Sequence, residues 1–462
     1  MSDMPMPASP RAQRLVIVGA VAAGTSVGAK ARRNDEEMEI VIYERDRDIS
    51  YSGCGIPLYL GGQVPNADQL HPRGPAWFED HHRIDVRTQH EVLAVDHETR
   101  SLRVRNLLTG EEFADHYDVL VLATGATPIV PQVPGAQRPG VFTVRSIRDA
   151  EAMEGWLEMR HPSTLAVIGS GSMGMELTDM LHQRGLQVTM VERASQVLPT
   201  FDADMAAHVE STLTHHGVQV RLGVGVAAIE GGDAVTSVLL QSGERVPAGM
   251  VILNVGLCPN VELARQLGAT LGASGAVRVD SAMRTSVPDV FAVGDAAESH
   301  SLVTGQPLWW THGSTANRMG LIAGNEITGG SFALRGVLGT AIFQVFDLAV
   351  GITGLTERDA RDQGLDVVVA VTSHLDRAVY AGGRRLTIKL IAEATTGRLL
   401  GAQAVGAQGV DKRIDVLATA ITFGATAADL LQIDLGYNPP FSTPRDPVHY
   451  AGLAIDELIR KR

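Results

Sequence analysis

The sequence predicts an α/β protein with two parallel-sheet units, followed by an α+β segment. Short apolar runs alternate with helical stretches through most of the chain, which is the pattern of α/β domains. A strand, a glycine-containing turn and a helix occur over residues 14–33, and the same succession returns over residues 165–184. From about residue 335 the pattern changes to strands and then helices, over 345–350, 386–391, 411–422 and 451–460.

The composition is that of a folded, acidic protein. The chain has 462 residues, of which 45% are hydrophobic and 20% charged, and its formal net charge is −13. At roughly 100–200 residues per domain, this length corresponds to two to four domains. The negative charge argues against nucleic acid or an anionic membrane as a partner. No apolar run approaches the roughly 18 residues of a membrane span, and the N-terminal residues lack the apolar region of a signal peptide.

The chain has only two cysteines, Cys54 and Cys258, and they form neither a CxxC nor a CxxxxC motif. A disulfide framework is therefore excluded, which indicates a reducing compartment, and we expect a cytoplasmic protein. Any thiol chemistry must then depend on one cysteine at a time.

The first unit carries an incomplete dinucleotide-binding motif. Gly19 and Gly24 occupy its first and last glycine positions, but Val21 replaces the middle glycine. Glu44 ends the next strand, 25 residues after Gly19, where a carboxylate binds ribose hydroxyls. Taken alone, this spacing is also found in ordinary turns.

The second unit carries the complete motif. Gly169, Gly171 and Gly174 follow the strand over residues 165–168, and Glu192 lies 23 residues after Gly169. A carboxylate at this position favours NADH, because it would repel a 2′-phosphate. Arg193 follows directly and leaves NADPH open.

Two further segments support a protein with two dinucleotides, FAD and NAD(P)H. Residues 123–128 follow a strand over 118–122, and residues 285–295 form a strand that ends in Gly294 and Asp295. Each segment could be an ordinary strand end. Four such features in this order make that alternative improbable.

The chain resembles the flavoprotein disulfide reductases with two Rossmann-like dinucleotide-binding domains, over nearly its whole length. The resemblance implies that the Gly19 unit binds FAD, that the inserted Gly169 unit binds NAD(P)H, and that the C-terminal segment forms a homodimer and contributes to the partner's active site. It places Arg45, Thr124, Gly125, Gly294 and Asp295 at the FAD. The expected domains are an FAD-binding domain over 14–150 and 271–330, an NAD(P)H-binding domain over 151–270 and a dimerisation domain over 331–462, after a disordered tail over 1–13.

Cys54 decides the branch of this family. Branches with an internal disulfide carry CxxxxC and a C-terminal His–Glu dyad, but here position 59 is Tyr59 and residues 434–448 contain no such dyad. The chain is similar to the coenzyme A-disulfide reductases, whose relatives are NADH oxidases, NADH peroxidases and persulfide reductases. Ala22 stands where the oxidases and peroxidases carry a histidine near the redox cysteine.

One cysteine beside a flavin has a defined chemistry. Its thiolate holds an oxidising equivalent as a mixed disulfide or persulfide with a small thiol, or as a sulfenic acid. We expect electrons to pass from NAD(P)H through FAD to the Cys54 disulfide. A lowered pKa of Cys54 is expected from the turn into a helix after Gly55. The alternative, a buried apolar cysteine, fits Cys258 better than Cys54.

The substrate contacts follow from charge and from the resemblance. Coenzyme A is polyanionic, so an acidic protein needs a local basic patch, for which Lys30, Arg32, Arg33 and Arg445 are suitable. The resemblance implies a substrate channel lined by Ser26, Lys30, Arg33, Ser50 and Arg445. It places Tyr437, and less directly Tyr380, near the reacting sulfur of the partner chain. Gly53 and Lys30 depart from the family pattern, so the disulfide itself stays open.

The predicted function is reduction of coenzyme A disulfide, with coenzyme A able to remain bound to Cys54. The alternatives are a persulfide or polysulfide reductase, an NADH oxidase, and, in a different class, a redox signalling protein with little turnover. No metal is expected, because the adjacent pairs His81–His82 and His215–His216 lack metal-ligand spacing. Trp309 and Trp310 either narrow the approach to the flavin or pack at a domain junction, and packing is favoured. Asn317 and Arg318 are expected to be structural.

Overall fold

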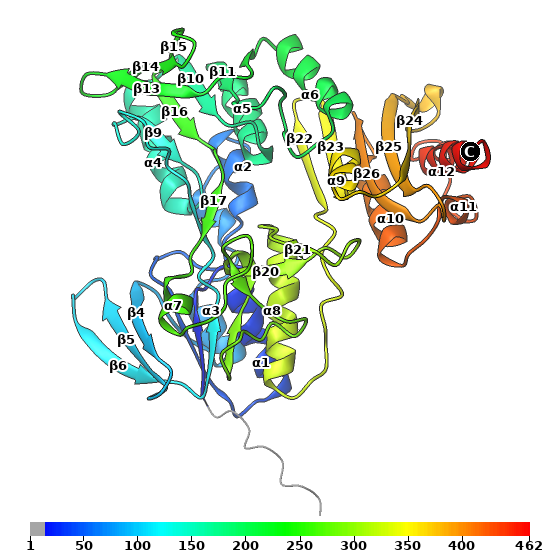
Figure 1. Ribbon diagram of the computed structural model, residues 1–462. Helices are drawn as coiled ribbons and strands as arrows, with labels where there is room; N and C mark the ends of the chain where they lie inside the picture. The colour runs from blue at the N-terminus through cyan, green and yellow to red at the C-terminus, as the bar shows by residue number, and fades with distance from the viewer. Residues whose placement is uncertain (1–13) are drawn as a thin grey trace, which may run out of the picture.

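The computed structural model describes residues 14–462, and the tail predicted over 1–13 lies outside the described residues. Figure 1 shows three bodies: a first unit at the bottom, a second unit at the upper left and a C-terminal domain at the right. Helix α2 (Ile56–Leu60) belongs to the first part of the chain but lies beside helices of the second unit.

A five-stranded parallel sheet forms the centre of the first unit. Its strands lie in the order β19-β7-β1-β2-β3, and each neighbouring pair is parallel. They are β1 (Arg14–Val18), β2 (Glu39–Tyr43), β3 (Asp85–Arg87), β7 (Val119–Leu122) and β19 (Val290–Ala292). All five residues of β1 are buried, as expected for a central parallel strand. Because β19 follows the whole second unit in the chain, the second unit is inserted into the first.

The remaining elements of the first unit cover this sheet and its edges. Helices α1 (Ala23–Asn34) and α8 (Gly313–Ile327) lie side by side in Figure 1. An antiparallel sheet consists of β4 (His90–Asp96), β5 (Ser101–Asn106) and β6 (Glu112–His116). The smaller elements are α3 (Pro75–His82), α7 (Glu262–Gln266), β18 (Val277–Arg278), β20 (Ala297–His300) and β21 (Pro307–Leu308).

The second unit repeats the same plan. Its parallel sheet has the order β12-β11-β10-β16-β9. The strands are β9 (Val141–Thr143), β10 (Thr164–Ile168), β11 (Gln187–Val191), β12 (Gln219–Arg221) and β16 (Met250–Leu253). Its helices are α4 (Ile147–Arg160), α5 (Ser172–Gln183) and α6 (Ala203–His215), and a side sheet contains β13 (Val226–Gly231), β14 (Val235–Leu240) and β15 (Arg245–Pro247).

The two units are connected by a short antiparallel pair, β8 (Ala126–Pro128) and β17 (Leu257–Pro259). Helix α5 begins three residues earlier than the predicted 175–184, because Gly171 takes the N-cap position. The boundaries expected between the domains stay a prediction.

The C-terminal domain is an antiparallel sheet with helices packed on it. The sheet order is β22-β23-β26-β25-β24. The strands are β22 (Ala341–Val345), β23 (Leu348–Gly354), β24 (Val367–Leu375), β25 (Arg385–Glu393) and β26 (Leu399–Gly406), and the helices are α9 (Glu357–Asp362), α10 (Val410–Thr422), α11 (Ala427–Leu430) and α12 (Pro447–Arg460). Helix α12 begins sharply because Pro447 is its first residue and Asp446 caps its N-terminus.

One strand predicted in this domain is wrong. Residues 345–350 do not form one strand, because the chain turns back at Phe346 and Asp347 between β22 and β23. Phe346 adopts a φ of 53°, and its backbone N–H donates to Asp179 Oδ2 at 2.7 Å. A contact with a distant residue therefore stabilises a turn inside an apolar run.

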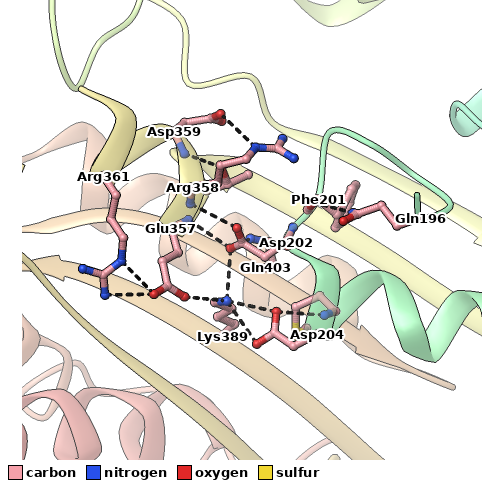
Figure 2. Close-up of polar contacts among 12 residues, drawn as sticks. Gln196, Phe201, Asp202, Asp204, Glu357, Arg358, Asp359, Arg361, Lys389 and Gln403 are labelled. Atoms are coloured by element: carbon pink, nitrogen blue, oxygen red, sulfur yellow. Dashed lines mark hydrogen bonds and ion pairs between the residues drawn. The ribbon is translucent and has the colours of Figure 1, made fainter. Parts of the chain in front are cut away.

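A buried polar cluster joins the second unit to the C-terminal domain, as Figure 2 shows. The Lys389 side chain is 4% exposed, and its Nζ lies 2.9 Å from carboxylate oxygens of Asp204 and Glu357 and 3.3 Å from Asp202. Asp202 also accepts a hydrogen bond from Gln403 Nε2 at 2.5 Å and from the backbone N–H of Glu357 at 2.9 Å. Residues from both bodies thus share one charged network. Within residues 14–462, no helix is long and apolar enough to cross a bilayer.

Candidate active site

Two equivalent glycine turns follow the central strands of the two parallel sheets. Gly19 has a φ of +109°, and a Cβ there would lie 2.2 Å from the Ala123 carbonyl oxygen. Gly169 has a φ of +99°, and its Cβ would lie 2.1 Å from the Asn254 carbonyl oxygen. Only glycine fits these positions, and α1 and α5 begin just beyond them. Such turns at helix N-termini fit the pyrophosphate of a dinucleotide.

The other residues predicted for the glycine turns lie in the turn before α1 or the turn before α5, or at the start of those helices. They are Val21, Gly24, Gly171 and Gly174, of which Gly24 and Gly174 fall in the first turns of α1 and α5. Both turns therefore lie where the sequence predicts them, and their contacts with cofactors stay a prediction.

The acidic residue predicted to contact a ribose accepts a hydrogen bond from a backbone N–H of each turn. Glu44 Oε2 accepts the backbone N–H of Ala20 at 2.8 Å, and burial raises the pKa of Glu44. Glu192 Oε2 accepts the backbone N–H of Ser170 at 2.9 Å and its hydroxyl at 2.8 Å. Both carboxylates are thus fixed beside their turns, where ribose hydroxyls would bind. The neighbouring Arg45 and Arg193 are exposed.

Asp295 of the Gly294–Asp295 motif has two partners that were not predicted. Arg145 Nη2 donates to Asp295 Oδ2 at 2.5 Å, and Trp309 Nε1 donates to the Asp295 carbonyl oxygen at 2.8 Å. The Asp295 side chain is only 10% exposed, so the ion pair fixes its direction. No sequence motif singled out Arg145, which lies in the segment before α4. Trp310 packs against the core of the first unit, in line with the packing interpretation.

Thr124 and Gly125 lie at the junction of the two units. Thr124 Oγ1 donates to the Asn260 carbonyl oxygen at 2.7 Å, and the backbone N–H of Asn260 donates to the Gly125 carbonyl oxygen at 3.0 Å. Thr124 and Gly125 therefore also connect the segment that leads into the second unit with the segment that leads back to the first unit.

Cys54 lies in a 3-10 turn, Gly53–Gly55, that leads directly into α2. The predicted transition from turn to helix is confirmed. Both Cys54 and Cys258 are free and exposed in the single chain. The interpretation of Cys258 as a buried cysteine is therefore wrong, because it lies in the short pair of β8 and β17 between the two units. Helix α2 contacts the second unit, because Arg184 Nη1 donates to the Leu60 carbonyl oxygen at 2.9 Å. The segment that carries Cys54 therefore touches both units.

The sequence predicted a lowered pKa for Cys54, and this prediction is wrong. The surrounding protein groups raise the pKa of the thiol. Surrounding atoms partly desolvate the thiol even though it is exposed, and this desolvation raises the pKa of Cys54. The negative charges of Glu176 and Asp295 add to the rise, whereas Arg145 opposes it. Helix α2 has only five residues, so its amide dipoles do not outweigh these effects.

Glu176 is a further residue that sequence analysis missed. It lies in α5, two residues after Gly174, and burial together with the charge of Asp179 raises the pKa of Glu176 to about 7. A carboxyl group that titrates near neutral pH beside a thiol is a candidate functional group. The available signal was an acidic residue on the otherwise apolar start of a helix.

Ser26 and Lys30, two residues predicted to contact the substrate, lie with Asn317 where α1 and α8 pack together. Ser26 Oγ donates to Asn317 Oδ1 at 2.6 Å, so Asn317, expected to be structural, adjoins a predicted substrate residue. Lys30 lies one turn further along α1, with its Nζ 2.9 Å from Asn34 Oδ1 and 5.5 Å from the centre of the Phe332 ring. The structure thus places a cation and two polar side chains on one surface.

The other basic residues divide into exposed and buried groups. Arg33 and Arg445 are exposed, which suits them to binding phosphate. Arg32 is only 8% exposed and donates to the backbone carbonyls of His82 and Met38, so its interpretation as part of a basic patch is wrong. Ser50 has a φ of 49° and donates its backbone N–H to Ala20, next to the first glycine turn.

The two predicted tyrosines lie on exposed loops of the C-terminal domain. Tyr380 is 82% exposed and Tyr437 is 52% exposed. The loop between β24 and β25, which carries Tyr380, lies on the outer side of this domain and apart from α2 in Figure 1. The single chain does not bring this loop to its own Cys54.

Two dinucleotide-binding turns in nested units, with the free thiol of Cys54 near Asp295, define a pyridine nucleotide-dependent flavoprotein. The chain belongs to the pyridine nucleotide-disulphide oxidoreductase family, whose model matches residues 13–320, and its dimerisation-domain model matches residues 340–446. The family uses FAD and NAD(P)H, and the glycine turns of this chain fit both. The protein is therefore an FAD- and NAD(P)H-dependent oxidoreductase that forms a homodimer.

The chain is similar to proteins that are named as CoA-dependent sulfur oxidoreductases and coenzyme A disulfide reductases. It is 38% identical over 438 residues to the NAD(P)H sulfur oxidoreductase (CoA-dependent) of Pyrococcus furiosus, covering 94% of this chain and 97% of that protein. It is 31% identical over 444 residues to a coenzyme A disulfide reductase of Staphylococcus aureus, covering 95% and 99%. The crystal structure of reduced Bacillus anthracis CoADR-RHD matches with a TM-score of 0.96 and 35% identity, over 98% of this chain and 81% of that chain.

Proposed function

We propose that this enzyme uses NAD(P)H to reduce coenzyme A disulfide through one redox-active cysteine, Cys54. The observation that carries the proposal is the exposed free thiol of Cys54 near Arg145 and Asp295, with Tyr59 in place of a second cysteine. A single thiol cannot form the internal disulfide that would accept two electrons. The second sulfur must then come from the substrate.

The proposed reaction consists of one thiol–disulfide exchange and one two-electron reduction. The Cys54 thiolate attacks one sulfur of coenzyme A disulfide, forms a mixed disulfide and releases one coenzyme A thiolate. Two electrons from NAD(P)H then cleave the mixed disulfide, release the second coenzyme A and regenerate the Cys54 thiolate. FAD held at the Gly19 turn would supply the redox chemistry that carries these two electrons from NAD(P)H to the mixed disulfide. Overall, one disulfide, one NAD(P)H and one proton give two thiols and NAD(P)⁺.

Partial burial and three charged groups act on the proposed thiolate. Burial and the carboxylates of Glu176 and Asp295 oppose ionisation of Cys54, and the cation of Arg145 favours it. Because the pKa of Glu176 is raised to about 7, this residue holds a proton over part of the neutral range. A proton on Glu176 removes the charge that disfavours the Cys54 thiolate.

The proposed substrate contacts come from the surface between α1 and α8. Ser26 and Asn317 offer hydrogen bonds, and Lys30 and Arg33 offer positive charge for the phosphates of coenzyme A. The acidic net charge of the chain makes such a local basic site necessary.

The second half of the proposed site comes from the other subunit. Tyr380 and Tyr437 are exposed on loops of the dimerisation domain, and Figure 1 supports the view that the Tyr380 loop faces away from α2 of its own chain. In the homodimer we place both tyrosines, together with Arg445, beside Cys54 of the partner subunit. Phenol hydroxyls there would donate hydrogen bonds to the departing sulfur.

A second candidate function is reduction of persulfides or polysulfides. The Pyrococcus furiosus relative is named a CoA-dependent NAD(P)H sulfur oxidoreductase, which favours this candidate. The same Cys54 thiolate would accept sulfane sulfur and release it on reduction.

Replacement of Cys54 tests the proposal. Wild type and C54S are reduced with NAD(P)H, and turnover is followed with coenzyme A disulfide, with polysulfide and with oxygen. We expect C54S to lose disulfide turnover while its FAD is still reduced, and C258S to match wild type. Disulfide turnover by C54S would contradict the proposal. Turnover of polysulfide but not coenzyme A disulfide would establish the second candidate, and rapid turnover with oxygen alone would indicate an oxidase.

A further inference from the structure

One buried arginine lies beneath both loops that carry the predicted tyrosines. The loop over residues 376–384 carries Tyr380, and the loop over residues 434–446 carries Tyr437. Arg413, on α10, is 1% exposed and contacts both loops. A buried arginine is uncommon, and it is found where its donors are satisfied.

The guanidinium of Arg413 forms hydrogen bonds to one group in each loop. Its Nη2 donates to the Asp376 carbonyl oxygen at 2.8 Å. Its Nε and Nη2 donate to the two carboxylate oxygens of Asp446 at 3.2 and 2.9 Å. Because the guanidinium is planar and its donors have fixed directions, these bonds set the relative position of the two loops.

Asp446 is held by more than the arginine. Ser442 Oγ donates to Asp446 Oδ2 at 2.7 Å, and the backbone N–H of Val448 donates to Oδ1 at 3.1 Å. Burial alone would raise the pKa of Asp446, but hydrogen bonds and the charge of Arg413 outweigh burial and hold the pKa below its usual value. The carboxylate therefore stays ionised and paired at neutral pH.

The two loops also contact each other directly. Arg377 Nη1 donates to the Pro440 carbonyl oxygen at 3.3 Å, and the backbone N–H of Ala378 donates to the Pro439 carbonyl oxygen at 3.4 Å. Asp376 Oδ1 accepts the backbone N–H of Arg384 at 2.7 Å, which closes the base of the first loop. The loops are thus joined at their base by Arg413 and further out by Arg377.

We propose that Arg413 is a positioning residue for disulfide reduction, which holds Tyr380 and Tyr437 at a fixed separation so that both reach the same substrate. The inference rests on the proposed function, because only there do the tyrosines meet a substrate. Neither tyrosine is fixed by burial, since they are 82% and 52% exposed. Their placement therefore depends on the anchors of their loops.

The test compares R413Q and R413K with the control K412M. Lys412 is the neighbouring residue, and its Nζ lies 3.5 Å from the same Asp446 carboxylate, but its side chain is 35% exposed. Each variant is assayed as the FAD-loaded dimer, with flavin reduction by NAD(P)H and coenzyme A disulfide turnover measured separately. A misplacement of about 1 Å in a catalytic group costs about 100-fold in rate.

We expect R413Q to lose about 100-fold in kcat/KM for coenzyme A disulfide, with flavin reduction and dimerisation unchanged. R413K should recover part of this loss, because lysine keeps the positive charge but cannot bond both loops in the fixed directions of a guanidinium. K412M should match wild type. Disulfide turnover by R413Q within about twofold of wild type would overturn the inference.

Two further measurements keep the test decisive. If R413Q does not yield a flavin-loaded dimer, R413K becomes the deciding variant, because it keeps a buried cation but cannot bond Asp376 and Asp446 with the planar arginine fork. Slower disulfide turnover with unchanged flavin reduction is then required of R413K, and normal disulfide turnover overturns the inference. If wild type itself fails to reduce coenzyme A disulfide, the proposed function is at fault rather than the role of Arg413.

Discussion

Lys389 Nζ lies 3.3 Å from Asp202 Oδ2, and this contact links the C-terminal domain to the start of α6 in the second unit. Burial lowers the pKa of Lys389, but hydrogen bonds to Glu357 and Asp204 more than offset this effect, so the pKa is raised and the ammonium stays charged. The relative position of the nucleotide-binding unit and the dimerisation domain therefore depends on a satisfied buried charge (Figure 2).

Substitution of Lys389 by methionine should destabilise the protein strongly. K389M leaves Asp202 buried without its cation, and loss of one partner of a buried pair costs about 3–5 kcal/mol. The midpoint of thermal unfolding should fall by several degrees. The control is K461M, because Lys461 is exposed near the C-terminus and its replacement should change stability by less than about 0.5 kcal/mol. Equal unfolding midpoints of K389M and K461M would contradict this account of the cluster.

Substitution of Glu176 by glutamine should lower the pKa of Cys54. The carboxylate of Glu176 raises that pKa, so its removal increases the thiolate fraction and the rate of alkylation by iodoacetamide. Because Glu176 has a pKa of about 7, the difference between E176Q and wild type should be large at pH 8 and small at pH 6. E158Q is the control, since Glu158 is exposed on α4. Slower alkylation of E176Q at pH 8 would show that the sign is wrong.

Substitution of Arg145 by methionine should weaken FAD binding. R145M removes the charged partner that fixes Asp295, and a hydrogen bond to a charged group contributes about 1.5–3 kcal/mol. We expect the Kd for FAD to rise about 10- to 100-fold, measured as flavin absorbance retained after dialysis. The control is R148M, because Arg148 contacts Asp46 with a side chain that is 62% exposed. Full FAD retention by R145M would contradict the assigned role.

Features encoded by local sequence could be predicted, and features created by distant contacts could not. The turns at Gly19 and Gly169 were predictable because strand, glycine and helix N-terminus are consecutive in the chain. The turn at Phe346 was not, because its backbone N–H bonds to Asp179 in another domain. Local apolar character alone suggested a continuous strand there.

The same distinction applies to the candidate site. Position and neighbours predicted that Cys54 is the reactive thiol, but the direction of its pKa depends on partial burial and on Glu176 and Asp295, which only the fold brings near. Arg413 also escaped notice, because an arginine in an amphipathic helix has the pattern of an ordinary exposed residue until the loops that cover it are known.

The chemical state of Cys54 tests the central claim most directly. The intact mass of the native, FAD-loaded protein is measured before and after treatment with a thiol reductant, with C54S as the control. The account predicts that wild type exposed to coenzyme A disulfide carries one coenzyme A, that reductant removes it, and that C54S carries none. An unmodified or merely oxygenated Cys54, together with rapid turnover of oxygen or peroxide, would contradict it.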